Sequence, residues 1–296
     1  MKNITTTLLF LLCTTLIIAQ SIDRDVLSSA GDYFEGPNSS ISWTLGEIAT
    51  ETLTDGNFIL TQGFQQPYGI VIHGIDLDVL VYLEGPYNGG TMNTILKDEG
   101  EIPLEQPYNI SPWFYTGTEN VVSIPDNVVD WVLVDLRDAT SAAAANPSTS
   151  IERQAAFLLE DGSVVGLDGA SLLQFSATLS IEPYVVIWHR NHLGVLSANS
   201  PTETGGIYNY DFSTDITQAF GEGLGYKLID TGIFGMAAGD ANTDGSINFD
   251  DKALWVGQAG TKGYLSSDFN LDTHVNNPDK NELMIQNQDL SSQVPE

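Results

Sequence analysis

Two twelve-residue windows near the C-terminus place oxygen-bearing side chains at the same positions. Loop 1 is Asp240–Asp251 and loop 2 is Asp268–Asp279. Both have Asp at positions 1, 5 and 12 and Asn at positions 3 and 9. A calcium ion takes about six to eight oxygen ligands, and a chain can supply them by curling round the ion with a ligand at every second residue. The repeated spacing therefore predicts two calcium loops, which constrain this segment to two similar turns.

Each loop offers six predicted ligands for Ca²⁺. Positions 1, 3, 5 and 12 would contribute side-chain oxygens, position 7 its backbone carbonyl, and position 9 an amide oxygen or a water. The predicted ligands are Asp240, Asn242, Asp244, Ser246, Asn248 and Asp251 in loop 1, and Asp268, Asn270, Asp272, His274, Asn276 and Asp279 in loop 2. The alternative is a pair of solvated turns, but the duplicated spacing and the apolar residue at position 8 of both loops favour Ca²⁺.

The segment 236–296 resembles the type I dockerin family, whose tandem motifs have the form D-x-N-x-D-G-x-[IV]-N-x-x-D followed by a helix. Loop 1 matches every motif position, including Gly245 and Ile247. Short helices are expected after the loops, over residues 252–257 and 280–288. The resemblance implies a small α-helical, Ca²⁺-binding module and a cohesin-like protein as its partner.

Loop 2 departs from the motif at two positions. Thr273 occupies position 6, where the motif has a glycine, and a β-branched residue is costly at the positive φ needed there. Pro278 alters a position at which dockerins present side chains to a cohesin. We therefore expect weaker or distorted metal binding in loop 2, and Ca²⁺ binding is better supported than cohesin binding.

Residues 1–20 have the order of a secretory signal peptide. Lys2 precedes an apolar run over residues 8–18, and small residues follow it. The run is too short to span a bilayer core of about 30 Å, so we expect secretion without membrane insertion. Because Cys13 is the only cysteine and lies in this run, the mature chain would have no disulfide and no thiol chemistry.

Acidic residues dominate the charge of the chain. Lysine and arginine number 10 against 39 aspartates and glutamates, which gives a formal net charge of −29. Such a surface repels nucleic acid and anionic lipid. We therefore expect neither nucleic acid nor a membrane surface as a partner.

The remainder of the chain has the pattern of a mainly β protein. Short β-branched and aromatic runs alternate with Gly, Pro, Asn and Asp turns. We expect a small N-terminal β module over residues 21–67, with strands at 40–45 and 58–62 and a turn at 55–57 before the second strand, and an antiparallel β-sandwich over residues 70–235. Sandwich strands are predicted at residues 79–83, 128–136, 155–160, 164–167, 173–179, 184–189 and 193–198.

Both β regions also show family resemblances. The first, through Ser42–Glu47 and Leu60–Pro67, resembles a short module of many secreted bacterial proteins to which no activity is attached. The second, through Leu83–Tyr87, Asp130–Asp138 and His189–Leu193, resembles a region of secreted bacterial adhesin-like or hydrolase-associated proteins. Neither resemblance implies a catalytic residue.

Residues with catalytic or metal-binding chemistry are sparse outside the two loops. His189 and His192 are expected to flank a two-residue hairpin turn at Arg190-Asn191, as a polar cluster or a weak transition-metal site, with Arg190 in a surface ion pair. The carboxylates Asp130 and Asp135, like Asp76 and Asp78, are expected to be solvated charges at strand ends. The chain contains no motif of a serine hydrolase, a zinc protease or a phosphate-binding loop.

Aromatic residues give the last candidate site. Trp113 and Tyr115 lie in a proline-containing loop and could stack on a glycan, although a loop anchored by a buried Trp113 is the favoured alternative. The sequence thus favours a secreted, calcium-binding, non-catalytic attachment or scaffold protein. The alternatives are an accessory component of extracellular polysaccharide degradation, which binds a cohesin-like protein or the polysaccharide, and a glycoside hydrolase.

Overall fold

The computed structural model describes residues 30–36, 39–45, 52–54, 59–61 and 74–296. The chain divides into two compact units, residues 1–71 and 72–296, which are considered separately. The predicted signal peptide and the predicted turn at residues 55–57 lie outside the described residues.

In its described residues, the first unit contains two antiparallel strand pairs. Strand β1 (Ala30–Gly36) pairs with β2 (Ser39–Leu45), and β3 (Thr52–Thr54) pairs with β4 (Ile59–Thr61). Strands β2 and β4 confirm the two strands predicted in this region. The prediction missed β1, whose sequence Ala-Gly-Asp-Tyr-Phe-Glu-Gly contains three residues, two glycines and an aspartate, that are uncommon in strands.

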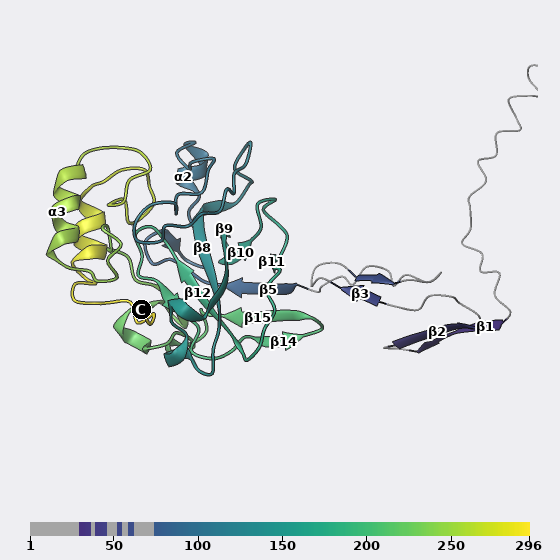
Figure 1. Ribbon diagram of the computed structural model, residues 1–296. Helices are drawn as coiled ribbons and strands as arrows, with labels where there is room; N and C mark the ends of the chain where they lie inside the picture. The colour runs from purple at the N-terminus through teal and green to yellow at the C-terminus, as the bar shows by residue number, and fades with distance from the viewer. Residues whose placement is uncertain (1–29, 37–38, 46–51, 55–58, 62–73) are drawn as a thin grey trace, which may run out of the picture. The chain divides into compact units, whose positions relative to one another are not determined.

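The second unit is built mainly from β-strands (Figure 1). Its strands are β5 (Ile75–Leu80), β6 (Tyr87–Asn88), β7 (Thr91–Met92), β8 (Val128–Asp138), β9 (Ser150–Leu159), β10 (Ser163–Val165), β11 (Leu173–Phe175), β12 (Pro183–Trp188), β13 (Val195–Leu196), β14 (Thr202–Thr204), β15 (Ile207–Asp211), β16 (Tyr226–Asp230) and β17 (Ile233–Met236). Its helical segments are α2 (Ile95–Asp98), α3 (Phe249–Gln258), the 3₁₀ turns η1 (Ala142–Ala144), η2 (Pro147–Thr149), η3 (Ile216–Gln218) and η4 (Glu222–Leu224), and the π-helical η5 (Asp279–Met284).

Nine of these strands form one curled, mixed sheet. Its order is β13-β12-β8-β9-β10-β5-β15-β14, with β11 also pairing with β5. Strand β15 runs parallel to β5, whereas the other pairs are antiparallel. The expectation of purely antiparallel pairing is therefore wrong. The two small pairs β6-β7 and β16-β17 lie outside this sheet.

Strand β8 is the central element of the sheet. It pairs with β9 on one side and with β12 on the other, and all its residues except the last are buried. Seven of its eleven residues are apolar, and the charged residues Asp130, Asp135 and Arg137 are buried among them. Trp131 is fully buried and its ring packs 4.2 Å from that of Phe157 on β9.

The seven predicted strands of this region correspond to β5 and β8–β13, with shifted ends. The predicted hairpin through Asp161-Gly162 is confirmed, because β9 pairs with β10 and Gly162 has a φ of +89°. The predicted two-residue turn at Arg190-Asn191 is wrong. Strand β12 ends at Trp188 and β13 begins at Val195, so six residues connect them.

The loop segment packs within the same compact unit as the sheet. Helix α3 and η5 lie beside each other on one side of the sheet (Figure 1). The predicted helix at residues 252–257 is present as α3, which begins earlier, at Phe249, and the predicted helix at 280–288 corresponds to the shorter η5. Among the described residues, no helix combines the length and the apolar character needed to cross a membrane.

Candidate functional site

Loop 1 is curled by hydrogen bonds from its own backbone to its acidic side chains. The carboxylate of Asp240 accepts from the amides of Asp244 and Gly245, at 3.1 and 3.0 Å. The carboxylate of Asp251 accepts from the amides of Asn242 and Asn248, at 3.1 and 2.8 Å. Side chains at positions 1 and 12 are therefore drawn to the inside of the turn.

Loop 2 repeats this network at the same positions. Asp268 accepts from the amides of Asp272 and Thr273, at 3.1 and 2.9 Å, and Asp279 accepts from those of Asn270 and Asn276, at 3.1 and 2.8 Å. The backbone is also repeated. Position 4 has a φ of 58° in loop 1 and 56° in loop 2, and position 6 has 81° and 76°.

Thr273 adopts the left-handed conformation that the sequence analysis expected to be costly. Its φ of 76° nearly equals that of Gly245, so loop 2 keeps the turn despite its β-branched residue. The neighbouring hydrogen bonds hold this conformation, including the one from the Thr273 amide to Asp268. The departure from the motif thus changes the energy of loop 2 more than its shape.

Each loop pairs with the segment that follows the other loop's helix. In loop 1, the amide of Ile247 donates to the carbonyl of Leu290, beyond η5, at 2.9 Å. In loop 2, the amide of Val275 donates to the carbonyl of Thr261, beyond α3, at 3.0 Å. Ile247 and Val275, both at position 8, are buried in one apolar cluster with Trp255. Each half therefore pairs with a segment of the other half, and the two halves form one module.

The carboxylates at positions 1 and 12 are buried in both loops. Burial, together with the charge of Asp251, raises the pKa of Asp240 to about 7. Burial likewise raises the pKa of Asp268 to about 7. Pairs of buried carboxylates are costly unless a cation stabilises their charged forms. The arrangement therefore favours a bound cation.

The donors of the loops suit a hard cation such as Ca²⁺. Carboxylate, amide and carbonyl oxygens are the ligands that Ca²⁺ prefers, and neither loop offers a thiol. His274, at position 7, is exposed and would contribute only its backbone carbonyl. Within residues 74–296, no group of three or more His, Cys, Asp or Glu side chains is already arranged to hold a metal. A cation would therefore need the Asn and carbonyl oxygens and a small inward movement of the carboxylates.

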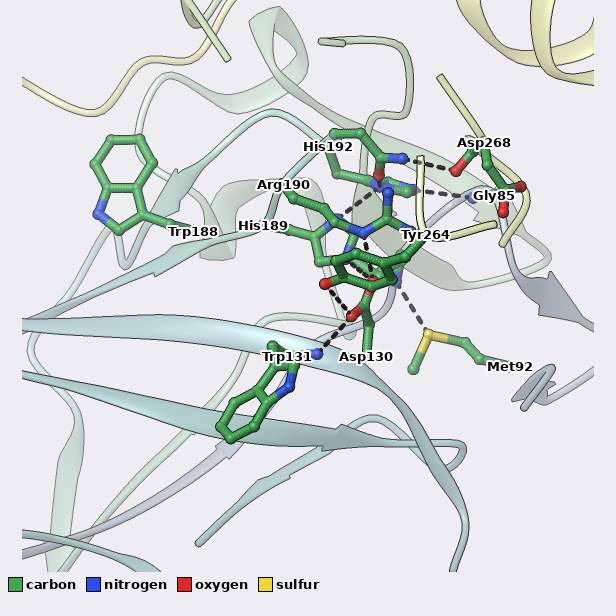
Figure 2. A network of polar contacts seen from close by, with 12 residues as sticks. Gly85, Met92, Asp130, Trp131, Trp188, His189, Arg190, His192, Tyr264 and Asp268 are labelled. Atoms are coloured by element: carbon green, nitrogen blue, oxygen red, sulfur yellow. Dashed lines mark hydrogen bonds and ion pairs between the residues drawn. The ribbon is translucent and has the colours of Figure 1, made fainter. Parts of the chain in front are cut away.

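A buried polar network connects the sheet to the loop module (Figure 2). At its centre is Asp130 of β8, which is fully buried. Its carboxylate accepts from Arg190 Nε at 2.8 Å and from the hydroxyl of Tyr264, between α3 and loop 2, at 2.7 Å. Burial would raise the pKa of Asp130, but Arg190 and His189 outweigh it and hold the pKa at about 2. Asp130 is therefore an anion paired with a buried cation.

Two histidines extend this network, and the tautomer of each ring fixes which atom donates each hydrogen bond. His192 Nε2 accepts from the amide of Gly85 at 3.2 Å, so its proton is on Nδ1, which lies 3.1 Å from His189 Nδ1. His189 then carries its proton on Nε2 and donates to Asp130 at 3.2 Å. Burial lowers the pKa of both imidazoles. The chain of hydrogen bonds is complete only when both rings are neutral.

These positions correct three expectations from the sequence. Asp130 and Asp135 are buried inside β8 and are not solvated charges at strand ends. Arg190 forms a buried ion pair, not a surface one. His189 and His192 are buried in the six-residue connection between β12 and β13, with rings 4.9 Å apart, and the hydrogen-bond acceptors of each ring are already in use. The polar cluster is real, but it lies inside the protein.

Loop 2 contacts the sheet unit through its backbone carbonyls. Asn191 donates to the carbonyl of Asp268 at 2.7 Å, and Asn93 donates to that of Asn270 at 3.0 Å. Gly85 approaches Phe269 so closely that a Cβ at this position would lie 1.7 Å from the Phe269 carbonyl oxygen. The start of loop 2 is thus fixed against the segments that follow β5, β7 and β12.

A second group of contacts fixes the segment that follows η5. Glu84 binds Lys227 Nζ at 2.5 Å and also accepts from the side chain of Asn287. Asn287 is fully buried and donates to the carbonyl of Ala238 at 2.8 Å. The sequence analysis missed both groups of contacts. For Asp130 a signal existed, since a carboxylate inside a run of buried apolar residues needs a buried partner.

The two predicted glycan contacts have different positions. Trp113 is half-buried, packs edge-on against Tyr108 at 4.9 Å, and lines a cleft beside loop 1. Tyr115 is buried, and its hydroxyl contacts Glu119 and the carbonyl of Arg153. Tyr115 does not line this cleft, whereas Trp188, which the sequence analysis did not single out, does.

No protein-family model, curated protein or solved structure matches this chain. The function must therefore be inferred from the geometry of the loops, the buried network and the cleft.

Proposed function

We propose that this is a secreted, calcium-binding, non-catalytic attachment or scaffold protein. Its dockerin-like loop module would bind two Ca²⁺ ions and lock onto the sandwich-like β unit of the same chain. The observation that carries the proposal is the repeated network. In both loops the carboxylates at positions 1 and 12 accept the same four backbone hydrogen bonds and are buried, and no cationic side chain within residues 74–296 is bonded to them.

The choice of Ca²⁺ follows from the donors and the charge. Three carboxylates and two amide side chains in each loop supply the oxygen-rich, anionic set that Ca²⁺ requires. Calcium would also convert the buried carboxylates, whose pKa is raised to about 7 at position 1, into charged ligands near neutral pH. A formal net charge of −29 adds a long-range attraction for divalent cations.

The contacts of the module support docking within the chain. Its loop 2 carbonyls, Tyr264 and Asn287 all bond to residues of the sheet unit or of its connecting segments. A module held only by a linker would not need buried polar groups at this boundary. The metal would therefore stabilise the whole unit of residues 72–296.

Isothermal titration of the EDTA-treated full chain with Ca²⁺ tests the proposal. We expect two sites. The double substitution Asp240→Ala with Asp251→Ala should remove one, and Asp268→Ala with Asp279→Ala should remove the other. Because of Thr273, the site that loop 2 provides should be the weaker one.

The matched control is Asp250→Ala. Asp250 lies beside Asp251 at position 11, is exposed, and accepts no hydrogen bond within loop 1. This substitution should leave both sites intact. The calcium proposal is refuted if the native chain gives no heat of Ca²⁺ binding, or if both double variants give the same heat of binding as the native chain.

A second candidate function is docking to a cohesin-like protein through α3. Phe249, Ala253 and Val256 are exposed and lie at spacings of four and three residues, which place them on one face of the helix. Phe249 exposes 71% of its surface. Binding of the calcium-loaded chain to a recombinant type I cohesin should be lost with Phe249→Ala and Val256→Ala. If the native chain shows no binding, docking to a type I cohesin is excluded.

A further inference from the structure

A cleft of about 1060 Å³ separates one face of the central sheet from loop 1. Trp113, Trp188 and Arg153 line its sheet side, and residues 243–246 of loop 1 line the opposite side. The cleft is large enough for an extended ligand, because pockets for small molecules span about 300–1000 Å³. It is also distinct from the network around Asp130.

The strand register brings the polar and aromatic side chains of the cleft together. Asp135 of β8 lies opposite Arg153 of β9, and Trp188 of β12 lies opposite Leu133. Because alternate residues of a strand share a face, Leu133, Asp135 and Arg137 present their side chains on the same side as Trp188 and Arg153. The sheet thus offers an indole, a carboxylate and two guanidinium groups on one surface.

The charges on this surface largely cancel. Arg137 Nε binds Asp135 at 2.9 Å, and Arg137 also donates to the carbonyls of Ala145 and Pro295, so this cation is fully engaged. The lining also contains Arg153 and the acidic groups Asp244 and Glu296. A strongly anionic or cationic ligand would therefore meet groups of its own sign. An uncharged ligand with many hydroxyl groups would not.

We propose that this cleft binds an uncharged segment of a glycan chain. Trp113 and Trp188 provide flat apolar surfaces for the faces of sugar rings, and the charged and serine side chains provide donors and acceptors for hydroxyl groups. The Trp113 indole nitrogen has no acceptor among the described residues. A rotation of this side chain toward a ligand therefore breaks no hydrogen bond.

Loop 1 makes this binding dependent on calcium, and this part rests on the proposed calcium site. Thr243, Gly245 and Ser246 form one wall, and the amides of Gly245 and Ser246 donate to the carboxylates of the proposed metal ligands Asp240 and Asp244. With Ca²⁺ in loop 1 the wall is fixed. Without Ca²⁺ the carboxylates repel one another and the wall loses its shape.

Titration of the full chain with a soluble xylan, a mannan and a β-glucan, in excess Ca²⁺, tests the proposal. We expect at least one of these neutral polysaccharides to bind. Trp113→Ala and Trp188→Ala should each weaken this binding by about tenfold or more, as for other central aromatic anchors. If Trp188→Ala does not fold, Trp113→Ala carries the test, because its loop lies outside the sheet.

The matched control is Phe114→Ala. Phe114 adjoins Trp113 but exposes 66% of its surface and does not line the cleft, so its loss should leave binding unchanged. Binding to none of the three glycans, preference for the anionic polygalacturonate, or binding by both tryptophan variants as strong as that of the native chain would overturn the proposal.

The calcium dependence is tested separately. EDTA, or Asp240→Ala with Asp251→Ala, should weaken glycan binding. If Ca²⁺ binds loop 1 but has no effect on glycan binding, the coupling fails and the proposed calcium function stands. If glycan binds the tryptophan surface although no Ca²⁺ binds, the proposed calcium function is refuted and the proposed glycan site remains supported.

Discussion

At the scale of single residues, Asp130 is the side chain on which most contacts converge. It accepts from Arg190, His189, Tyr264 and a backbone amide, and it is fully buried. A buried ion pair contributes little net stability, but the loss of one partner leaves an uncompensated charge. The role of Asp130 is therefore best measured by the cost of removing its charge.

Asp130→Asn should destabilise the chain by about 3–5 kcal/mol, because Arg190 would remain buried without its anion. Urea unfolding in excess Ca²⁺ measures this cost. The matched control is Asp78→Asn on β5, whose side chain is exposed and should change stability by less than about 0.5 kcal/mol. Equal effects of the two substitutions would show that the Asp130–Arg190 pair is not buried as described.

The two histidines give a pH dependence with a definite sign. Burial lowers the pKa of His189 and His192 below the ordinary value of 6.5. Below that pH the unfolded chain binds protons that the folded chain does not, so stability is full above it and declines as pH falls. The decline can reach about 1.4 kcal/mol per pH unit for each histidine.

Urea unfolding between pH 7.5 and pH 5, in saturating Ca²⁺ to keep the loop carboxylates charged, measures this decline. His192→Gln should flatten the curve, because it removes one of the two protonations, while Asp130, Arg190 and Tyr264 remain around His189. A profile in the native chain that is flat, or that rises toward low pH, contradicts the neutral pair.

At the scale of elements, loop 1 and α3 each contain a glycine whose substitution by alanine should change stability in opposite directions. Gly245 has a φ of 81°, and a Cβ there would meet nothing closer than Ser292 Cβ at 3.7 Å. Gly245→Ala should therefore cost about 1–2 kcal/mol through backbone strain alone. Gly257, inside α3, also has open space around it, so Gly257→Ala should stabilise the chain by about 0.5–1 kcal/mol.

Thermal unfolding of both variants in excess Ca²⁺ tests this pair of predictions. The two substitutions add the same methyl group to uncrowded positions, so only the local backbone distinguishes them. Effects of the same sign would mean that loop 1 does not hold position 6 in the left-handed conformation. The result also bears on Thr273, which adopts that conformation with a side chain already present.

The sequence predicted the positions of the individual strands and loops better than the segments with which they pair. Alternation and turn residues located β8, β9 and β10, and the duplicated spacing located both loops, because these signals are carried by neighbouring residues. The parallel pairing of β15 with β5 and the exchange between Ile247 and Leu290 depend on segments far apart in the chain. Asp130 was misplaced for the same reason, since Arg190 and Tyr264 are distant in sequence and only the fold shows that they meet.

At the scale of the whole molecule, the loop module and the sheet behave as parts of one unit of residues 72–296. Asp130 and Glu84 anchor the two ends of loop 2 and η5 to the sheet region. Folding energy supplied by a metal in the loops would therefore be shared with the sheet. Removal of the metal should lower the stability of both.

Calcium at about one hundred times its dissociation constant should stabilise this unit by about 2.7 kcal/mol for each independent site. Trp131 is fully buried in the sheet, so near-ultraviolet circular dichroism, which reports on buried aromatic side chains, follows the sheet during unfolding. We expect its midpoint to shift with Ca²⁺ by the same amount as the helical signal of α3.

Asp130→Asn separates a shared transition from two independent ones. By weakening the connection between Tyr264 and β8, it should make the sheet respond less to Ca²⁺ than the loops do. In the native chain, the unfolding midpoint of the sheet could be independent of Ca²⁺ while the loop segment unfolds at its own calcium-dependent midpoint. This result would show that the module is only tethered to the sheet by the chain. The buried network would then serve the sheet alone, and attachment through a free module would become the better account of the protein.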